Sequence, residues 1–169
     1  GGVSLGDRGV RFGSDAAGAV TSSTASLTIR GDDLEYNDLA FGFSNSLEST
    51  GGVVMESHSS SFSSAFDYEN FDLDPSVSSV RIGKTTNTAN VVIKDPVAMA
   101  GPISIYGGDI LLEEDLTSTL SGADVLVKGR GDVEAVASRS FLTNNGDIVF
   151  WSNSDNSGVG SIKLGNDNV

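Results

Sequence analysis

The feature that most constrains this chain is a repeat of about 22 residues, in which short apolar runs alternate with Gly, Asp and Asn. Ile103, Val125 and Ile148 begin equivalent runs at intervals of 22 and 23 residues. Ile110 and Val133 begin a second set of runs, again 23 residues apart. Within the runs, apolar residues recur at every second position, which indicates strands rather than helices.

A repeat of this length, built from short strands, is typical of a solenoid. We therefore predict an all-β fold, a parallel β-helix of about seven coils of 21–23 residues that spans residues 1–169 as a single domain. Gly-Asp and Asn-Gly pairs are suited to the corners between strands. The alternative is a β-sandwich, which also has short strands at regular spacing but would not keep the same offsets within each unit.

The repeat is stretched in one region. Val53 and Ile82 occupy equivalent positions 29 residues apart, and the residues between them are polar, acidic and rich in serine. We predict an inserted loop or hairpin at 56–77 that projects from the solenoid, with Phe62, Phe66 and Phe71 packing it against the body.

Composition excludes several classes of partner. The formal net charge is −13, from 10 Lys and Arg against 23 Asp and Glu, so nucleic acids and anionic lipids are disfavoured. The sequence has no Cys, and it has no apolar run long enough to cross a bilayer as a helix. It begins GGVSLG and stops at LGNDNV within the repeat pattern, so we expect a piece of a longer repeat protein.

Three segments carry a resemblance to a known family. RIGKTTNTANVVI (81–93), VAMAGPISIYGGDILLEEDLTS (97–118) and LTNNGDIVFWSNSDNSGVGSIKLG (142–165) resemble the repeats of filamentous-haemagglutinin-like adhesins. These are very large bacterial surface and secreted proteins. The resemblance implies a right-handed β-helix, an extracellular location at the bacterial surface or in secreted form, and attachment to a host, neighbouring-cell or matrix glycan or protein. The family has no universal catalytic residues that would transfer to this chain.

Catalytic motifs are weak in this sequence. Its one histidine, His58, lies in a serine-rich stretch that has no second His, no Cys and no G-x-S-x-G elbow. We therefore predict that the chain is not an enzyme. A β-helical carbohydrate-active domain is the alternative, and an extracellular filament subunit that self-associates end to end is a second alternative.

No cofactor is required by these motifs, although calcium is a possible ligand. Asn153, Asp155 and Ser157 stand at alternate positions before Gly158, as at the start of an EF-type loop. The twelfth position of such a loop, which should be acidic, is Leu164. An Asn- and Asp-rich turn without metal explains the same residues. The acidic segment 67–74 is a weaker calcium candidate.

Two Arg-Gly-Asp triplets occur, and they suggest either integrin recognition or simple corner chemistry. Because Gly-Asp is a favoured corner pair in this sequence, an Arg before it makes the triplet by chance. A stiff corner close to the body would also limit insertion into a receptor cleft. The triplets are Arg30-Gly31-Asp32 and Arg130-Gly131-Asp132.

The outward positions of the predicted strands are the best binding candidates. If Ile103, Val125 and Ile148 point inward, alternation places Tyr106, Lys128 and Trp151 outward on three successive coils. Aromatic rings beside a cation suit sugar stacking or a protein partner. We therefore predict a structural and adhesive module that serves as stalk and attachment surface. A neighbouring segment that covers this strip is the alternative.

Overall fold

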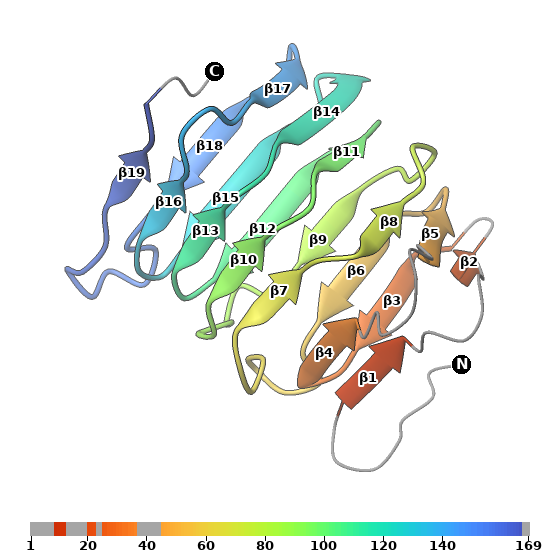
Figure 1. Ribbon diagram of the computed structural model, residues 1–169, viewed down its shortest axis with the longest axis horizontal. Helices are drawn as coiled ribbons and strands as arrows, with labels where there is room; N and C mark the ends of the chain where they lie inside the picture. Colours follow the sequence, from red (N-terminus) through yellow and green to blue (C-terminus); the bar gives the residue numbers. More distant parts are fainter. Residues whose placement is uncertain (1–8, 13–19, 23–24, 37–44, 167–169) are drawn as a thin grey trace.

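The computed structural model describes residues 9–12, 20–22, 25–36 and 45–166, and in these ranges it is an all-β, right-handed parallel solenoid (Figure 1). Every strand pairing is parallel, and each strand pairs with its equivalent in the next coil. The described residues contain no helix, so none of them forms a helix that could cross a membrane. The predicted fold class is confirmed, and the sandwich alternative is wrong.

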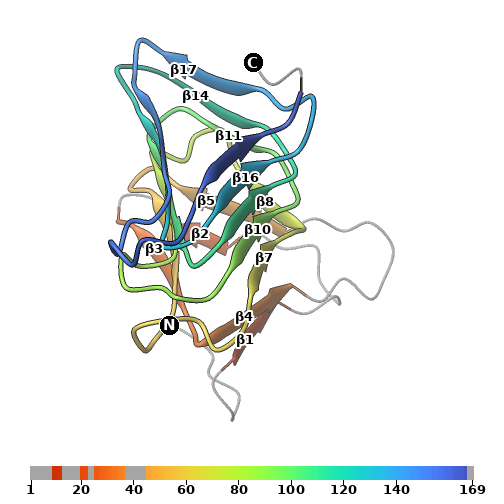
Figure 2. The same cartoon turned by 90° about the vertical axis from the view of Figure 1, so that its left-hand side faces the viewer.

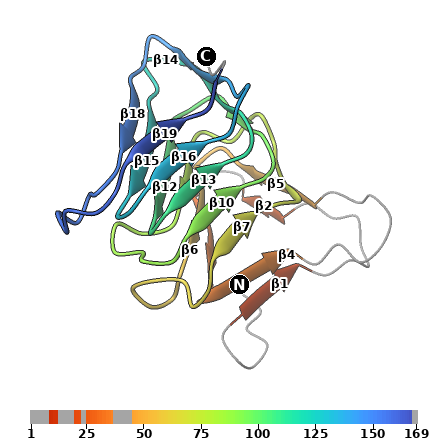
Figure 3. The same ribbon diagram turned by 60° about the vertical axis from the view of Figure 1, so that its left-hand side comes forward.

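The largest wall is a six-stranded sheet, which we call the long sheet. It contains β3 (Leu27–Arg30), β6 (Val53–Glu56), β9 (Val80–Ile82), β12 (Ile103–Gly107), β15 (Val125–Gly129) and β18 (Ile148–Trp151). A second wall stands beside it in Figure 3 and contains β7 (Phe66–Tyr68), β10 (Val91–Ile93), β13 (Ile110–Leu112), β16 (Val133–Ala135) and β19 (Ile162–Leu164). β4 (Asp33–Tyr36) lies next to β7 and pairs with β1 (Gly9–Phe12).

Two three-stranded sheets form the remaining wall. The first contains β2 (Val20–Ser22), β5 (Asn45–Ser49) and β8 (Phe71–Leu73). The second contains β11 (Val97–Met99), β14 (Leu116–Ser121) and β17 (Phe141–Asn144), and β11 lies next to β8. The walls enclose a core that is seen nearly end-on in Figure 2. Five turns have all three strands, from β3–β5 to β15–β17, so about five complete coils replace the seven that we predicted.

Alternation within each strand builds the core. Ile103 and Val125 are fully buried, and Ile148 continues the same column in register. Ile148 is nevertheless 40% exposed, because β18 belongs to the last coil and no described strand covers its outer edge. Burial in this fold therefore depends on the neighbouring coil as much as on the strand's own pattern.

The insertion that we predicted at 56–77, as a loop or hairpin, is a shorter loop, and the rest of that range belongs to the regular walls. β7 pairs with β10, and β8 pairs with β5, so both strands are regular parts of the walls. The extra length is confined to the loop 57–65 between β6 and β7. Phe62, Phe66 and Phe71 are buried, and the Phe62 and Phe66 rings stack at 5.1 Å. All three rings belong to the main core: Phe66 and Phe71 lie on wall strands, and Phe62 packs the loop 57–65 against them.

Acidic and amide side chains join the coils at one corner of the solenoid. The Asp109 backbone NH donates to Asn90 Oδ1, and the Asp132 NH donates to Asp109 Oδ1, each at 2.9 Å. The Ser161 NH continues the ladder by donating to Asp132 Oδ1 at 2.8 Å. Backbone donors at a corner have lost their strand partners, so each side chain satisfies a donor of the following coil. Several of the chain's many carboxylates therefore have a structural role.

Candidate functional site

One row of residues on the outside of the long sheet contains the predicted binding strip. Tyr106, Lys128 and Trp151 are paired in register across β12, β15 and β18, one residue beyond the inward column of Ile105, Val127 and Phe150. Each therefore points away from the core on the same face. The structure brings these three residues together as the sequence predicts; binding by them stays a prediction.

Trp151 is the most accessible aromatic group of this row. Trp151 is 48% exposed, so the loop 57–65 does not bury it. Lys128 Nζ lies 3.9 Å from the centroid of the Trp151 ring, which is cation–π geometry. Leu126 and Val149 flank the row on the same face of the sheet, and Val149 is 40% exposed. We call Tyr106, Lys128 and Trp151 the aromatic strip.

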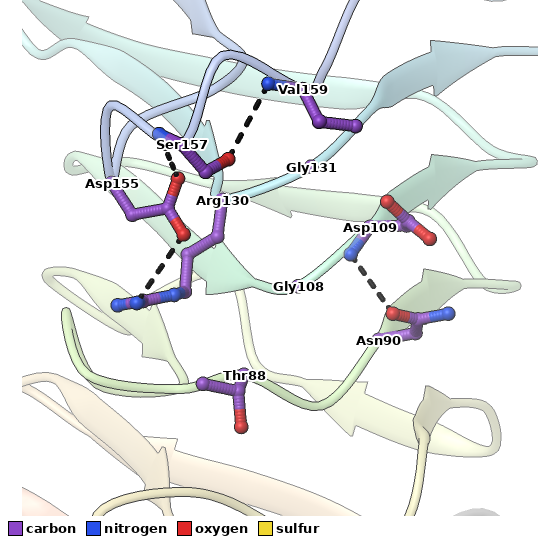
Figure 4. A pocket seen from close by; sticks show the side chains of 9 residues that line it. All are labelled: Thr88, Asn90, Gly108, Asp109, Arg130, Gly131, Asp155, Ser157 and Val159. Carbon is purple, nitrogen blue, oxygen red and sulfur yellow. Dashed lines mark hydrogen bonds and ion pairs between the residues drawn. The ribbon is translucent and has the colours of Figure 1, made fainter.

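A groove of about 380 Å³ begins where the aromatic strip ends. Its floor is two short corners, the first after β12 and the second after β15, and two longer loops rise on either side (Figure 4). One of these loops is residues 83–90, and the other is residues 152–161. The lining residues are Thr88, Asn90, Gly108, Asp109, Arg130, Gly131, Asp155, Ser157 and Val159.

Glycine at the two corners lets neighbouring coils approach closely at the floor of the groove. A Cβ on Gly108 would lie 2.4 Å from the Thr88 carbonyl oxygen, and a Cβ on Gly131 would lie 2.1 Å from Asp109 Oδ1. The corners stack through backbone hydrogen bonds, in which the Gly131 NH donates to the Gly108 carbonyl at 3.0 Å. A side chain at Gly108 would collide with the backbone of the neighbouring coil, so glycine is required there, whereas a side chain at Gly131 would displace the Asp109 carboxylate.

The two flanking loops are fixed to the body. Asn87 is buried in the loop 83–90, and its Nδ2 donates to the Tyr106 carbonyl at 3.0 Å. In the loop 152–161, the Asn153 and Ser154 NH groups donate to the carbonyls of Gly131 and Gly129, at 3.1 and 3.0 Å. Hydrogen bonds to the body of the solenoid therefore hold both side walls of the groove in place.

The second Arg-Gly-Asp triplet lies at the groove, with both of its charged ends in contact with the protein. An Arg130 guanidinium nitrogen lies 3.4 Å from Asp155 Oδ2. Asp132 accepts from the backbone and hydroxyl of Ser161 and forms an ion pair with Lys163 at 2.5 Å. The Lys163 hydrogen bond, followed by those from Ser161, lowers the pKa of the Asp132 carboxyl. An integrin would have to break these contacts.

The first triplet is also engaged. Arg30 Nε donates to Glu56 Oε1 at 2.7 Å, and Asp32 Oδ1 accepts from the Ser59 backbone NH at 2.6 Å. Arg81 Nη2 donates to the other oxygen of Glu56, also at 2.7 Å. We call Arg30, Glu56 and Arg81 the ion triad. Integrin binding by either triplet stays a prediction, and these contacts within the chain do not favour it.

The predicted calcium ligands of the loop 152–161 bind groups of the chain itself. Asn153 Oδ1 accepts from the Ser157 hydroxyl and the Gly158 NH at 3.2 and 3.0 Å. Asp155 Oδ1 accepts from the Ser157 NH at 3.1 Å, and this hydrogen bond is the main cause of the lowered pKa of Asp155. The Arg130 guanidinium lies 3.4 Å from Asp155, and its positive charge opposes a cation beside that carboxylate. Calcium binding here stays a prediction that these contacts do not favour.

The other candidate residues are dispersed. Asp67 and Glu69 form ion pairs with Lys94, at 2.6 and 3.4 Å, and Asp74 caps the Ser76 NH at 2.7 Å. His58 is exposed in the loop 57–65. Within the described ranges, no three His, Asp or Glu side chains gather in a group that would hold a metal ion.

Sequence reasoning found the aromatic strip but missed both the groove and the ion triad. The signal for the groove was the contrast between the short glycine corners at 107–109 and 129–131 and the longer polar loops at 83–90 and 152–161. The signal for the triad was the spacing of Arg30, Glu56 and Arg81 at intervals of 26 and 25 residues, close to one coil. Neither signal is visible without knowing which coils are neighbours.

Comparisons with known proteins add no family to this description. No family model matches the sequence, and no curated protein or solved structure is significantly similar to it. The resemblance to filamentous-haemagglutinin-like repeats therefore stays a prediction. The solenoid arrangement is compatible with that resemblance but does not identify the family.

Proposed function

We propose that this chain is a structural and adhesive module of an exported bacterial surface protein, in which a rigid solenoid presents an attachment surface for a glycan or a cell-surface or matrix partner. The observation that carries this proposal is the aromatic strip, where Trp151 is half-exposed and stacked with Lys128 on the outer face of the long sheet. Exposed aromatic rings supply large contact areas, and they dominate the energetics of many interfaces.

The support is geometric in two ways. Consecutive members of the aromatic strip are on adjacent parallel strands, so they repeat at about 4.8 Å and present successive faces to an extended polymer. The groove at the end of the strip adds polar groups that suit hydroxyl-rich ligands. Backbone pairing fixes β12, β15 and β18, which carry the aromatic strip, so binding would require little reorganisation.

A binding array of glycans and matrix proteins, run with and without calcium, tests this proposal. Trp151→Ala is expected to weaken binding to the captured ligand by ~1–3 kcal/mol. Leu142→Ala is the matched control, because Leu142 is a large apolar residue with similar exposure, 49%, on β17 in a different wall. Equal binding by the wild-type chain and Trp151→Ala would contradict the proposal.

A further inference from the structure

Lys128 and Arg130 are two cations with weak carboxylate contacts among the residues whose side chains the structure describes. Lys128 has the Trp151 ring as its neighbour, and Arg130 reaches Asp155 only at 3.4 Å. Of the other six cations, five donate a hydrogen bond of 2.5 to 2.8 Å to a carboxylate oxygen, whereas Lys84 donates to the carbonyl oxygens of His58 and Ser59, at 3.3 and 2.7 Å. These six are Arg30, Arg81, Lys84, Lys94, Arg139 and Lys163.

These two cations stand where the aromatic strip meets the groove. Lys128 lies on β15 within the strip, and Arg130 lies two residues further on, in the corner that forms the groove floor. Both are partly exposed. On a chain whose net charge is −13, Lys128 and Arg130 place two positive charges at this junction, and Asp155 contacts only the second of them, at 3.4 Å.

The groove itself favours hydroxyl groups over further anions. Asp109 and Asp155 line it and are hydrogen-bond acceptors when ionised. Thr88 and Ser157 add hydroxyl groups. A densely sulfated or phosphorylated polymer would meet the two carboxylates, whereas a sugar acid carries one carboxylate per ring among several hydroxyls. The volume of about 380 Å³ falls within the usual range for ligand sites, roughly 300–1,000 Å³.

We propose that the aromatic strip and the groove together bind a polysaccharide that contains uronic acids. A sugar ring stacks on the face of Trp151 opposite Lys128, a carboxylate of the polymer is held by Lys128 and Arg130, and hydroxyls of the adjoining sugar donate to Asp109 and Asp155 in the groove. The inference rests on the proposed attachment function and specifies its ligand. Carboxylate recognition sets the preference for acidic sugars, and ring stacking supplies affinity that neutral sugars share.

Trp151 makes the test direct, because it is the only tryptophan of the chain and its fluorescence reports on the strip. The wild-type chain is titrated with oligogalacturonate, with the fully methyl-esterified oligomer and with polyglutamate, all without calcium. Oligogalacturonate is expected to change the fluorescence with an affinity at least about tenfold higher than the ester or the polypeptide.

The variants separate the charge from the ring. The double variant Lys128→Met with Arg130→Gln should bind oligogalacturonate about tenfold more weakly and lose the preference over the ester. Lys94→Met is the matched control, because Lys94 pairs with Asp67 and Glu69 near β10, and it should leave both affinities unchanged. Isothermal titration calorimetry checks that the fluorescence changes represent binding.

Three outcomes would overturn the inference. Equal binding of acid and ester, weakened by Trp151→Ala, would remove the uronic-acid specificity and leave the attachment function standing. Equal binding of polyglutamate would reduce recognition to charge alone. If neither oligomer binds, the uronic-acid assignment fails; the attachment function then fails only if the wider array of glycans and matrix proteins also shows no ligand that depends on Trp151.

Discussion

On the outer face of the long sheet, the first half of the molecule neutralises its own charges, whereas the second half leaves a cation between aromatic rings. Arg30, Glu56 and Arg81 form a triad in which one carboxylate receives hydrogen bonds from two guanidinium groups. Lys128, further along the sheet, lies between Tyr106 and Trp151 and has no carboxylate partner among the described residues.

The difference lies in the residue that the neighbouring coil supplies. Glu56 occupies an outward position of β6 but is only 4% exposed, because the two arginine side chains cover it. Trp151 occupies the equivalent outward position of β18, which is an edge strand of the sheet, and is 48% exposed. A charge in a solenoid is therefore structural or available for a ligand according to its partners in the coils above and below, and not according to its own strand.

Removal of the central carboxylate should have the largest effect on stability. Glu56→Ala leaves two guanidinium groups without their shared partner, and we expect the free energy of unfolding to fall by about 1–3 kcal/mol. The value should lie below that of a fully buried pair, because the Arg30 and Arg81 side chains are 54% and 36% exposed. Chemical denaturation of the two proteins measures the change.

The control for this variant is Glu134→Ala. Glu134 is an exposed glutamate on β16 with only a 3.9 Å contact to Lys163, and its loss should change stability by less than about 0.5 kcal/mol. Equal losses in the two variants would show that the triad has no special structural role, and the contrast between the ion triad and the aromatic strip would disappear.

A pH series tests the structural role of Glu56 in a second way, and its expected effect on stability is smaller. Burial opposes ionisation of Glu56, but the hydrogen bonds and charges of Arg81 and Arg30 outweigh it and lower the pKa of the carboxyl below its ordinary 4.5. A lowered folded-state pKa stabilises the fold above pH 4.5, and this contribution is lost as the pH falls through the folded-state pKa.

The measurement compares the wild-type chain with Glu56→Gln from pH 7 down to pH 3. All other carboxylates are common to both proteins, so the difference in unfolding free energy isolates Glu56. The wild-type advantage should be constant at neutral pH and should shrink below about pH 4.5. An advantage that grows on acidification would reverse the sign of the argument.

The repeat period was sufficient to predict the solenoid and its inward columns. Alternation in Ile103–Tyr106 and the 22-residue interval to Val125 determine which residues point out, and parallel pairing then aligns Tyr106 with Lys128. The aromatic strip follows from these two regularities. No longer-range information is needed, because each coil contacts mainly its neighbours.

Prediction failed where a coil has long corners. The loop 57–65 shifts the spacing between coils, and the short strands Phe66–Tyr68 and Phe71–Leu73 lie beyond it in a polar, acidic stretch. Their aromatic residues alternate correctly, but the altered spacing concealed this. The groove was missed for a related reason: loops from coils that are not adjacent, 83–90 and 152–161, form its two sides, and sequence alone does not show how far they rise.

The smallest effect on stability should come from giving Lys128 a carboxylate partner. Trp151→Glu places a carboxylate beside Lys128, as Glu56 lies beside Arg30 and Arg81, while Trp151→Gln removes the ring without adding charge. Because Trp151 is half-exposed, the new ion pair should raise the free energy of unfolding over that of the Gln variant by only about 0.2–1 kcal/mol. The difference should diminish in high salt.

Both variants should lose binding to the ligand of the strip, and the Glu variant should lose more if that ligand is acidic, because Lys128 is then neutralised and a negative charge faces the ligand. Equal losses in the two variants would limit the strip to ring stacking, whereas a stability gain of several kcal/mol would show that the strip is buried in solution and that its exposure does not distinguish it from the ion triad.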